Sequence, residues 1–381
     1  MSNTSQDAPQ AGRYVGKVVY LYAYNVGYEM KSQPVPELLG QPQSPFPGAL
    51  GRRGPRDAFF YRPQIFKLPS VERQGPQGPV RIDWTVKLFQ VGAMSLAVHV
   101  PFAVDRLENL ADYHSLKFAT GTLEDEVRAM AVRVFEELRP YCIRPVPSLK
   151  DEEAYTVFCL NAPLPDAPRR GQADRGAEAW LKANHRLVAA ILTEEEDLER
   201  LSLQEAREST ALYLSYYEHD LSVVDWDAAL FVDEPENFDE MLHVAELANV
   251  QLEELEVYDR TLDGVLDEAY RDLAVRRWWP RGDVQRRLRV IRVDLARVSD
   301  ELFNATKFFG DWHLARLYQN ISSRFHLSDW SRVIEGKLRT LGDLYNMLKL
   351  DQTNRLMVVL EALIVLLFII DVIILLLGLK G

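Results

Sequence analysis

An acidic stretch in the middle of the chain is the first place where residue types and spacing could support chemistry. Asp225 and Asp227 flank Trp226 in the segment YYEHDLSVVDWDAALFVDEPENFDE. Side chains two residues apart on a β-strand share one face, so these carboxylates could hold Mg²⁺. Spacing fixes no third ligand, and acid-rich segments are typical of solvated surface and helix caps. We therefore predict no metal or cofactor, and a metal-dependent hydrolase at this segment stays an alternative.

Two further carboxylates interrupt an apolar run near the end of the sequence. Residues 356–379 contain only Glu361 and Asp371 as charged positions. As a helix this run is roughly 36 Å long, enough to cross a hydrocarbon core of about 30 Å. An ionised carboxylate at bilayer depth is costly, so both acids should face protein or water. Their spacing of ten residues puts them on one coiled-coil seam with Asn354.

This seam leaves three interpretations open. The acids can be polar contacts that assemble membrane helices into an oligomer, which is the interpretation we favour. They can instead pair with a separate membrane protein. A ring of such helices could also form a cation-conducting channel lined by carboxylates.

A third cluster is basic. Arginines crowd a predicted helix–helix turn beside Trp278 and Trp279. Such a patch could contact anionic lipid or RNA, or it could pair with acids of the preceding helix. We favour the pairing, and a net charge of −12 argues against nucleic acid as a partner. The patch comprises Arg276, Arg277, Arg281, Arg286 and Arg287.

Motifs for enzymatic chemistry are missing from the sequence. It holds no phosphate loop, dinucleotide fingerprint, nucleophile elbow or HExxH motif, and its seven histidines stand singly. Cys142 and Cys159 lack metal-ligand spacing and fit a reducing compartment. We therefore predict a protein that is not an enzyme and has no catalytic or cofactor-binding residue.

The elements that must position these groups change in character along the chain. Residues 1–12 are polar and predicted to be disordered. Val- and Tyr-rich runs then alternate with helical periodicities, which predicts an α+β domain over residues 13–233. The expected strands lie at 13–30, 59–68, 80–91, 94–100, 154–160 and 221–232, the last as a strand or hairpin, and the expected helices at 102–116, 123–138, 177–192 and 202–211.

Beyond residue 233 the periodicity is helical. Two apolar stripes at heptad spacing, 248–273 and 288–309, predict an antiparallel hairpin, so residues 234–327 are expected to form this hairpin and a short helix. A stalk helix over 328–355 should continue unbroken into a transmembrane helix over 356–379. More basic residues precede the span than follow it, which places the amino-terminal domain in the cytoplasm.

Several segments of this second half resemble a known family. In chain order they are AELANVQLEELEVYDRTLDGVLDEAY, QRRLRVIRVDLARV, FFGDWHLARLYQNISSRFHL and RLMVVLEALIVLLFIIDV. They resemble the required-for-meiotic-nuclear-division family of tail-anchored proteins. The amino-terminal segment GAMSLAVHV also resembles the Gly-containing strand pair of this family. The resemblance implies an oligomeric membrane-tethered scaffold and carries over no catalytic residue. The order of parts is also similar to CorA-type cation channels, but a second span and their Gly-Met-Asn signature are missing.

These observations combine into one expectation. The protein should be a single-pass, tail-anchored scaffold of the inner (plasma) membrane, since its start has neither a secretory signal nor a mitochondrial presequence. We expect a homo-oligomer in a lipid bilayer that tethers an unidentified protein partner. The channel and the hydrolase are the alternatives.

Overall fold

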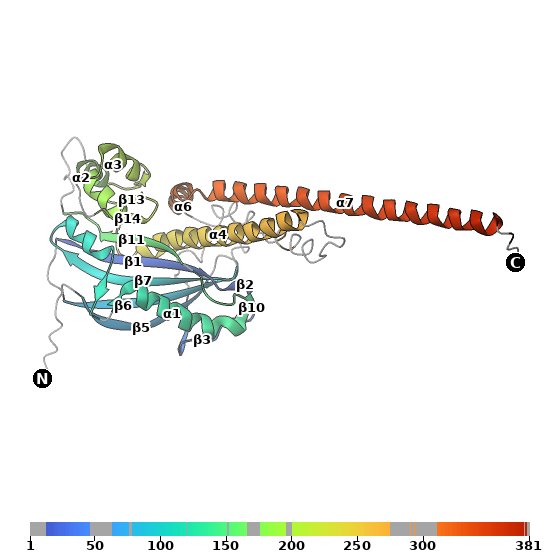
Figure 1. Cartoon of the computed structure of the whole chain (residues 1–381). Coiled ribbons are helices and arrows are strands. Elements are labelled where there is room, and N and C mark those ends of the chain that lie inside the picture. Colours follow the sequence, from blue (N-terminus) through green and yellow to red (C-terminus); the bar gives the residue numbers. More distant parts are fainter. Residues whose placement is uncertain are drawn as a thin grey trace. The chain divides into compact units, whose positions relative to one another are not determined.

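The computed structural model describes residues 13–45, 63–75, 78–119, 121–150, 152–165, 176–195, 200–274 and 311–376, and the single positions 290, 293 and 378. The chain divides into two compact units. The first comprises residues 1–254 and 302–328, and the second comprises residues 255–301 and 329–381. The first unit contains the strands, and the described part of the second is helical (Figure 1).

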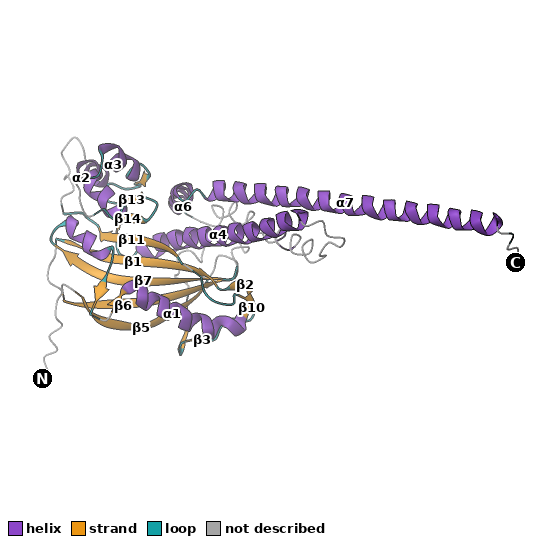
Figure 2. Cartoon of the chain, in the orientation of Figure 1, coloured by secondary structure: helices purple, strands orange, loops and turns teal. Residues whose placement is uncertain are grey.

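A mixed sheet forms the centre of the first unit (Figure 2). Within the described residues it has ten strands in the order β12-β13-β14-β11-β1-β7-β6-β5-β4-β3. Neighbouring strands are antiparallel except β11 and β14, which are parallel. The strands are β1 (Tyr14–Asn25), β3 (Glu37–Leu38), β4 (Gln41–Ser44), β5 (Gln64–Gly75), β6 (Gly78–Phe89), β7 (Ala93–Val104), β11 (Glu153–Asn161), β12 (Tyr213–Leu214), β13 (Leu221–Val224) and β14 (Ala228–Asp233).

Two small ribbons and the helices complete the described elements. The ribbons pair β2 (Gly27–Met30) with β10 (Cys142–Pro145), and β8 (Lys117–Phe118) with β9 (Gly121–Thr122). The α-helices are α1 (Leu123–Leu138), α2 (Gly176–Leu192), α3 (Leu203–Ser209), α4 (Phe238–Ala274), α6 (Trp312–Arg324) and α7 (Leu327–Leu376). The 3₁₀ helices are η2 (Leu107–Tyr113) and η3 (Arg139–Tyr141). The predicted α+β class is confirmed.

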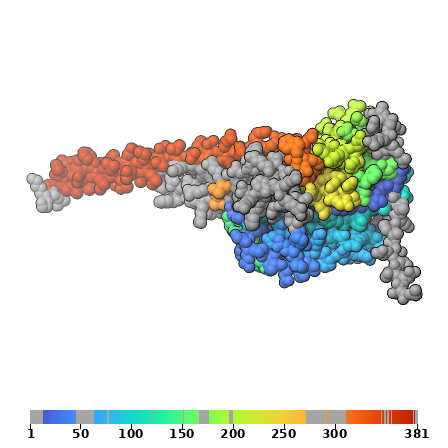
Figure 3. Space-filling model, turned by 180° about the vertical axis from the view of Figure 1, so that it is seen from behind, coloured from blue at the N-terminus to red at the C-terminus, as the bar shows by residue number. Residues whose placement is uncertain are grey.

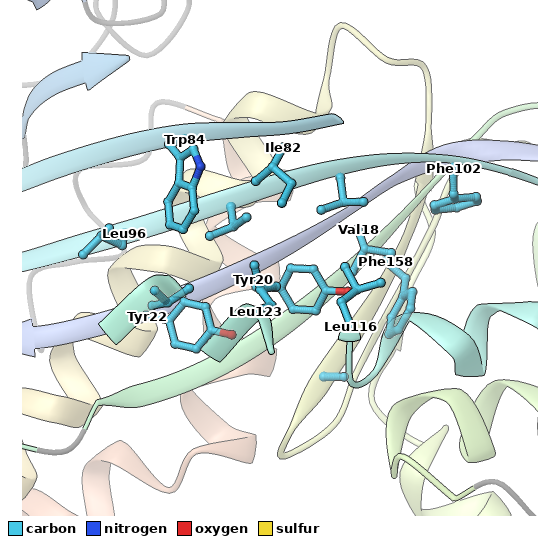
Figure 4. Close-up of a cluster of buried hydrophobic side chains, with 14 of the residues drawn as sticks. Val18, Tyr20, Tyr22, Ile82, Trp84, Leu96, Phe102, Leu116, Leu123 and Phe158 are labelled. Carbon is cyan, nitrogen blue, oxygen red and sulfur yellow. The ribbon is translucent and has the colours of Figure 1, made fainter. Parts of the chain in front are cut away.

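One face of the sheet carries an extensive apolar core. Alternate residues of β1, among them Val18, Tyr20 and Tyr22, point to this face because successive side chains of a strand alternate. Figure 4 shows them beside Trp84 of β6 and Leu123 of α1. Helix α1 turns its apolar stripe to the same core, and its amino terminus is closed by a capping box.

The helix predicted over residues 102–116 is wrong in its first part. Strand β7 continues to Val104, and η2 follows only at Leu107. Phe102 and Val104 are buried, whereas Pro101 before them and Ala103 between them are exposed. This alternation extends the strand pattern of β7 and opposes a helix.

Helix α4 begins on the other face of the sheet. Asn249 donates a hydrogen bond from Nδ2 to the main-chain oxygen of Glu153, at 3.0 Å. Lys17 of β1 and Lys87 of β6 form ion pairs with Asp239 and Glu246 of α4. In Figure 3 the start of α4, in yellow, lies directly beside the sheet. The first seventeen residues of this helix, 238–254, thus belong to the sheet-containing unit.

The long helices agree with the predicted periodicity as far as they are described. Helix α4 has 37 residues, and α7 runs unbroken for 50 residues, as predicted for a stalk that continues into its apolar end. The second arm of the predicted hairpin falls outside the described residues, apart from helical positions 290 and 293. The change from strand to helix along the chain does not coincide with the division between the compact units.

Candidate functional site

The apolar end of α7 is an extended exposed surface among the described residues of the second unit. Within the described residues one helical segment, Leu356–Leu376, is long and apolar enough to cross a membrane, with a mean hydropathy of 3.1. No residue of this segment is buried, and Phe368, for example, is 69% exposed. At about 1.5 Å per residue the segment spans roughly 31 Å, close to the hydrocarbon thickness of a bilayer. Contiguous exposed apolar surface of this kind marks an interaction site or a membrane segment.

The three predicted assembly residues lie on α7. Asn354, Glu361 and Asp371 are exposed, and the last two lie inside the apolar segment. At about 100° per residue, Asn354 and Glu361 lie roughly 20° apart around the helix and Asp371 roughly 80° from Glu361. The three side chains therefore share one side of α7, as a seam requires. Contacts between copies of the chain stay a prediction.

Further along the second unit, Lys337 of α7 binds two acids of α4. Its Nζ lies 2.7 Å from Oδ1 of Asp259 and 2.6 Å from Oδ1 of Asp263. Desolvation works against the charge of Lys337, but the hydrogen bonds to both aspartates raise its pKa above the usual value. Asp259 interrupts the apolar stripe of the sequence, and this ion pair explains its presence there.

Asp225 and Asp227 do not share a strand face, so that expectation is wrong. Both lie in the turn between β13 and β14, where the Asp225 N–H donates to the Ala228 oxygen at 2.9 Å. Asp225 is buried, whereas Trp226 and Asp227 are exposed. The turn therefore presents Trp226 and Asp227 to solvent between the two buried strands β13 and β14. Within the described residues no group of three or more His, Cys, Asp or Glu side chains could hold a metal ion.

The Asp225 carboxylate pairs with Arg324 of α6. Nε of Arg324 lies 3.3 Å from Oδ1 of Asp225, and its Nη2 donates to the main-chain oxygen of Glu208 at 2.7 Å. Tyr155 donates from its hydroxyl to the main-chain oxygen of Asp225 at 3.1 Å, and its ring meets Phe325 edge-on at 5.0 Å. This arrangement fastens α6 to the β13–β14 hairpin and to β11, which is a structural role.

The predicted basic patch lies outside the described residues. All five of its arginines, 276, 277, 281, 286 and 287, fall between Ala274 and Asp311, where only positions 290 and 293 are described. Its role stays a prediction.

A cavity that the sequence did not indicate lies between α4 and the sheet. Its volume is about 460 Å³, and strands β1, β5, β6 and β7 form its floor. Val19, Leu21 and Leu242 contribute apolar surface. The polar lining residues are Lys17, Lys67, Ser70, Arg81, Asp83, Thr85, Lys87, His99, Asp239 and Glu246. The one available signal was the alternation of Arg81, Asp83, Thr85 and Lys87 along β6.

Ion pairs organise the polar lining. Lys87 binds Oε2 of Glu246, which is almost fully buried. Arg81 lies 2.9 Å from Asp83, which also accepts a hydrogen bond from Ser70 at 2.5 Å. Desolvation acts against the charge of Asp83, but the hydrogen bonds from Ser70 and Arg81 hold the pKa of its carboxyl below the usual range. The cavity therefore holds fixed charges of both signs.

The resemblance proposed from the second half of the chain is wrong. The family model that matches describes "Uncharacterized protein MJ0711, N-terminal domain" and covers residues 15–239. The segments that suggested the other family lie almost entirely beyond this range. Their heptad spacing and apolar span follow from general requirements of helix packing and bilayer thickness, which unrelated families share.

A full-length relative agrees with the family match. The uncharacterized protein MJ0711 of Methanocaldococcus jannaschii is 23% identical over 294 residues, which cover 70% of this chain and 89% of the relative. No solved structure matches the chain. Because the family model covers well over half of the sequence and nearly all of the described sheet, the chain belongs to the MJ0711 N-terminal domain family.

Proposed function

We propose that this protein is a membrane-anchored scaffold. In this proposal α7 crosses a bilayer through Leu356–Leu376, and the sheet-containing unit stays on the cytoplasmic side, where it binds a protein partner. The observation that carries the proposal is that every residue of this 21-residue apolar segment is exposed. Transfer of this apolar surface from water into a bilayer is favourable by about 25 cal/mol for each Å² buried.

Flotation on liposomes tests the anchor. The full-length protein should float with vesicles and resist extraction by alkaline carbonate. A Leu363→Arg and Leu367→Arg double variant adds two charges at the centre of the segment, at about 2.5–3.5 kcal/mol each, and should stay with the soluble or aggregated fraction. The matched control is Val333→Arg, which adds a charge to an exposed apolar position of α7 outside the segment. Equal flotation of the double variant and the control would refute the anchor.

The assembly role of the acids needs a separate test. We propose that Glu361 and Asp371, with Asn354, contact the same residues of other copies. A scaffold of this kind should keep or gain oligomer stability when both acids are replaced by leucine, because buried polar groups are exchanged for apolar packing. The measurement is the oligomeric mass of the full-length protein in detergent, beside that of the double variant.

The outcomes separate the proposals. A monomeric full-length protein would refute self-assembly. It would favour the interpretation in which the two acids pair with a separate membrane protein. An oligomer that conducts cations in vesicles and loses conductance in the double variant would favour the channel instead.

A further inference from the structure

We propose that the cavity between α4 and the sheet binds a phosphate monoester of a small polyol or nucleoside. The proposal is independent of the membrane anchor, since every residue used here belongs to the sheet-containing unit. It rests on two available cations and on an unsatisfied acceptor of Glu246.

Two lysines at the cavity are available to an anion. Within the described part of the chain, no ion pair holds Lys67, which is exposed on β5. Lys17 lies 3.6 Å from Asp239, whose side chain is 62% exposed, and a pair of this kind contributes little in water. Lys87 and Arg81 are each engaged by an acid at closer range. Lys67 and Lys17 can therefore turn to a bound ligand at small cost.

The imidazole of His99 is a further polar group in the lining of the cavity. His99 lies on β7, in register with Asp83 of β6 and Val19 of β1. Burial is the main cause that lowers its pKa to about 3, and the nearby Lys17 and Lys87 lower it further. Asp239 and Asp83 oppose them with smaller effects. His99 is therefore neutral at physiological pH and adds no charge to the lining of the cavity.

Glu246 supplies the second recognition element. Its side chain is 1% exposed and lines the cavity. Oε2 binds Lys87, whereas Oε1 has no hydrogen-bond partner among the described residues. A buried acceptor without a donor is costly, so a ligand that brings an O–H or N–H group is favoured once the Glu246 carboxylate turns Oε1 toward the cavity.

Phosphate monoesters combine these requirements. At neutral pH the phosphate carries a charge of about −1.5 to −2, which two lysines can balance, and it offers three acceptor oxygens. A sugar or nucleoside supplies the hydroxyl or amino donor for Glu246. The cavity volume of about 460 Å³ lies in the range of small-molecule sites, and Val19, Leu21 and Leu242 provide apolar contact for the body of the ligand.

Binding of AMP and of ribose 5-phosphate to the full-length protein in a non-ionic detergent tests the proposal. Isothermal titration calorimetry should show saturable binding of at least one ester, at least about tenfold tighter than inorganic phosphate or adenosine, because each of these offers only half of the contacts. Clearly tighter binding of AMP than of ribose 5-phosphate would show that the nucleoside is recognised. Equal binding of the two would show that the sugar phosphate is sufficient.

Two variants connect binding to the cavity. Lys67→Ala removes an exposed side chain and leaves the fold intact, and we expect it to weaken ester binding about tenfold, as for loss of one charge-assisted hydrogen bond. Lys117→Ala is the matched control, because Lys117 is exposed on β8 and does not line the cavity. The proposal would be overturned if neither ester binds saturably, or if Lys67→Ala binds as tightly as Lys117→Ala.

Discussion

Lowering the pH from 7.5 to 5.0 should destabilise the sheet-containing unit through His243 of α4. The side chain of His243 is 6% exposed, and burial, reinforced by the charge of Lys87, lowers its pKa to about 3. The pKa of an unfolded histidine is about 6.5. Since the folded value is the lower one, the unfolded chain binds the extra proton between pH 6.5 and about 3.

The sign and size of the effect follow from this difference. The stabilising effect is complete above pH 6.5 and decreases by about 1.4 kcal/mol for each pH unit below it. At pH 5.0 the loss is about 2 kcal/mol for His243 alone. His99 has a lowered pKa of similar size and should add to the loss in the same direction.

Urea unfolding of the full-length protein, followed by tryptophan fluorescence in a mild detergent at pH 7.5, 6.0 and 5.0, measures this loss. His243→Asn keeps a polar side chain but cannot titrate, so its free energy of unfolding should depend less on pH than that of the wild type, by about 2 kcal/mol between the two extremes. His219→Asn is the control, since His219 is exposed. If His243→Asn and the wild type lose the same free energy between pH 7.5 and 5.0, His243 is not held neutral and the argument fails.

Three substitutions test other contacts. Arg324→Ala leaves the buried Asp225 carboxylate without its cation and should lower the free energy of unfolding by about 3–5 kcal/mol; a loss below 1 kcal/mol in urea unfolding would refute this role. Gly16→Ala places a Cβ 1.9 Å from the Cys159 oxygen, so β1 and β11 must separate, and calorimetry should show a clearly lower melting temperature than for a surface alanine variant. Lys337→Ala should make α7 more sensitive to limited proteolysis by a small margin, of about 1 kcal/mol or less, and unchanged cleavage would contradict its pairing with α4.

Local patterns predicted the elements that a continuous run of one residue character specifies. Helix α7 follows from an apolar run without a helix breaker, and β1 follows from its alternating Val and Tyr residues, which meet the core on one face. The predicted boundaries of elements were wrong where a strand pattern and a helix pattern overlap. At the end of β7, Val104 lies two residues after Phe102, as a strand alternation requires, and three residues before Leu107, as a helical stripe requires. Pairing with β1 decides for the strand.

The prediction for Asp225 and Asp227 was limited in the same way, because a local pattern does not decide between a strand and a turn. The sequence places Asp225 and Asp227 two residues apart, but whether they share a face depends on whether that stretch is a strand or a turn. The turn and the ion pair with Arg324 arise because α6, a hundred residues later in the chain, packs against the β13–β14 hairpin.

What the sequence by itself determined is the class of the fold, the long helices and the membrane-length segment, since each depends on residues that are neighbours along the chain. Only the tertiary structure decided the strand order and the cavity. The cavity joins Lys17 of β1, Lys67 of β5, His99 of β7 and Glu246 of α4, which are separated by up to about 230 residues. No local periodicity records such a meeting, because sheet pairing and the packing of α4 bring these side chains together.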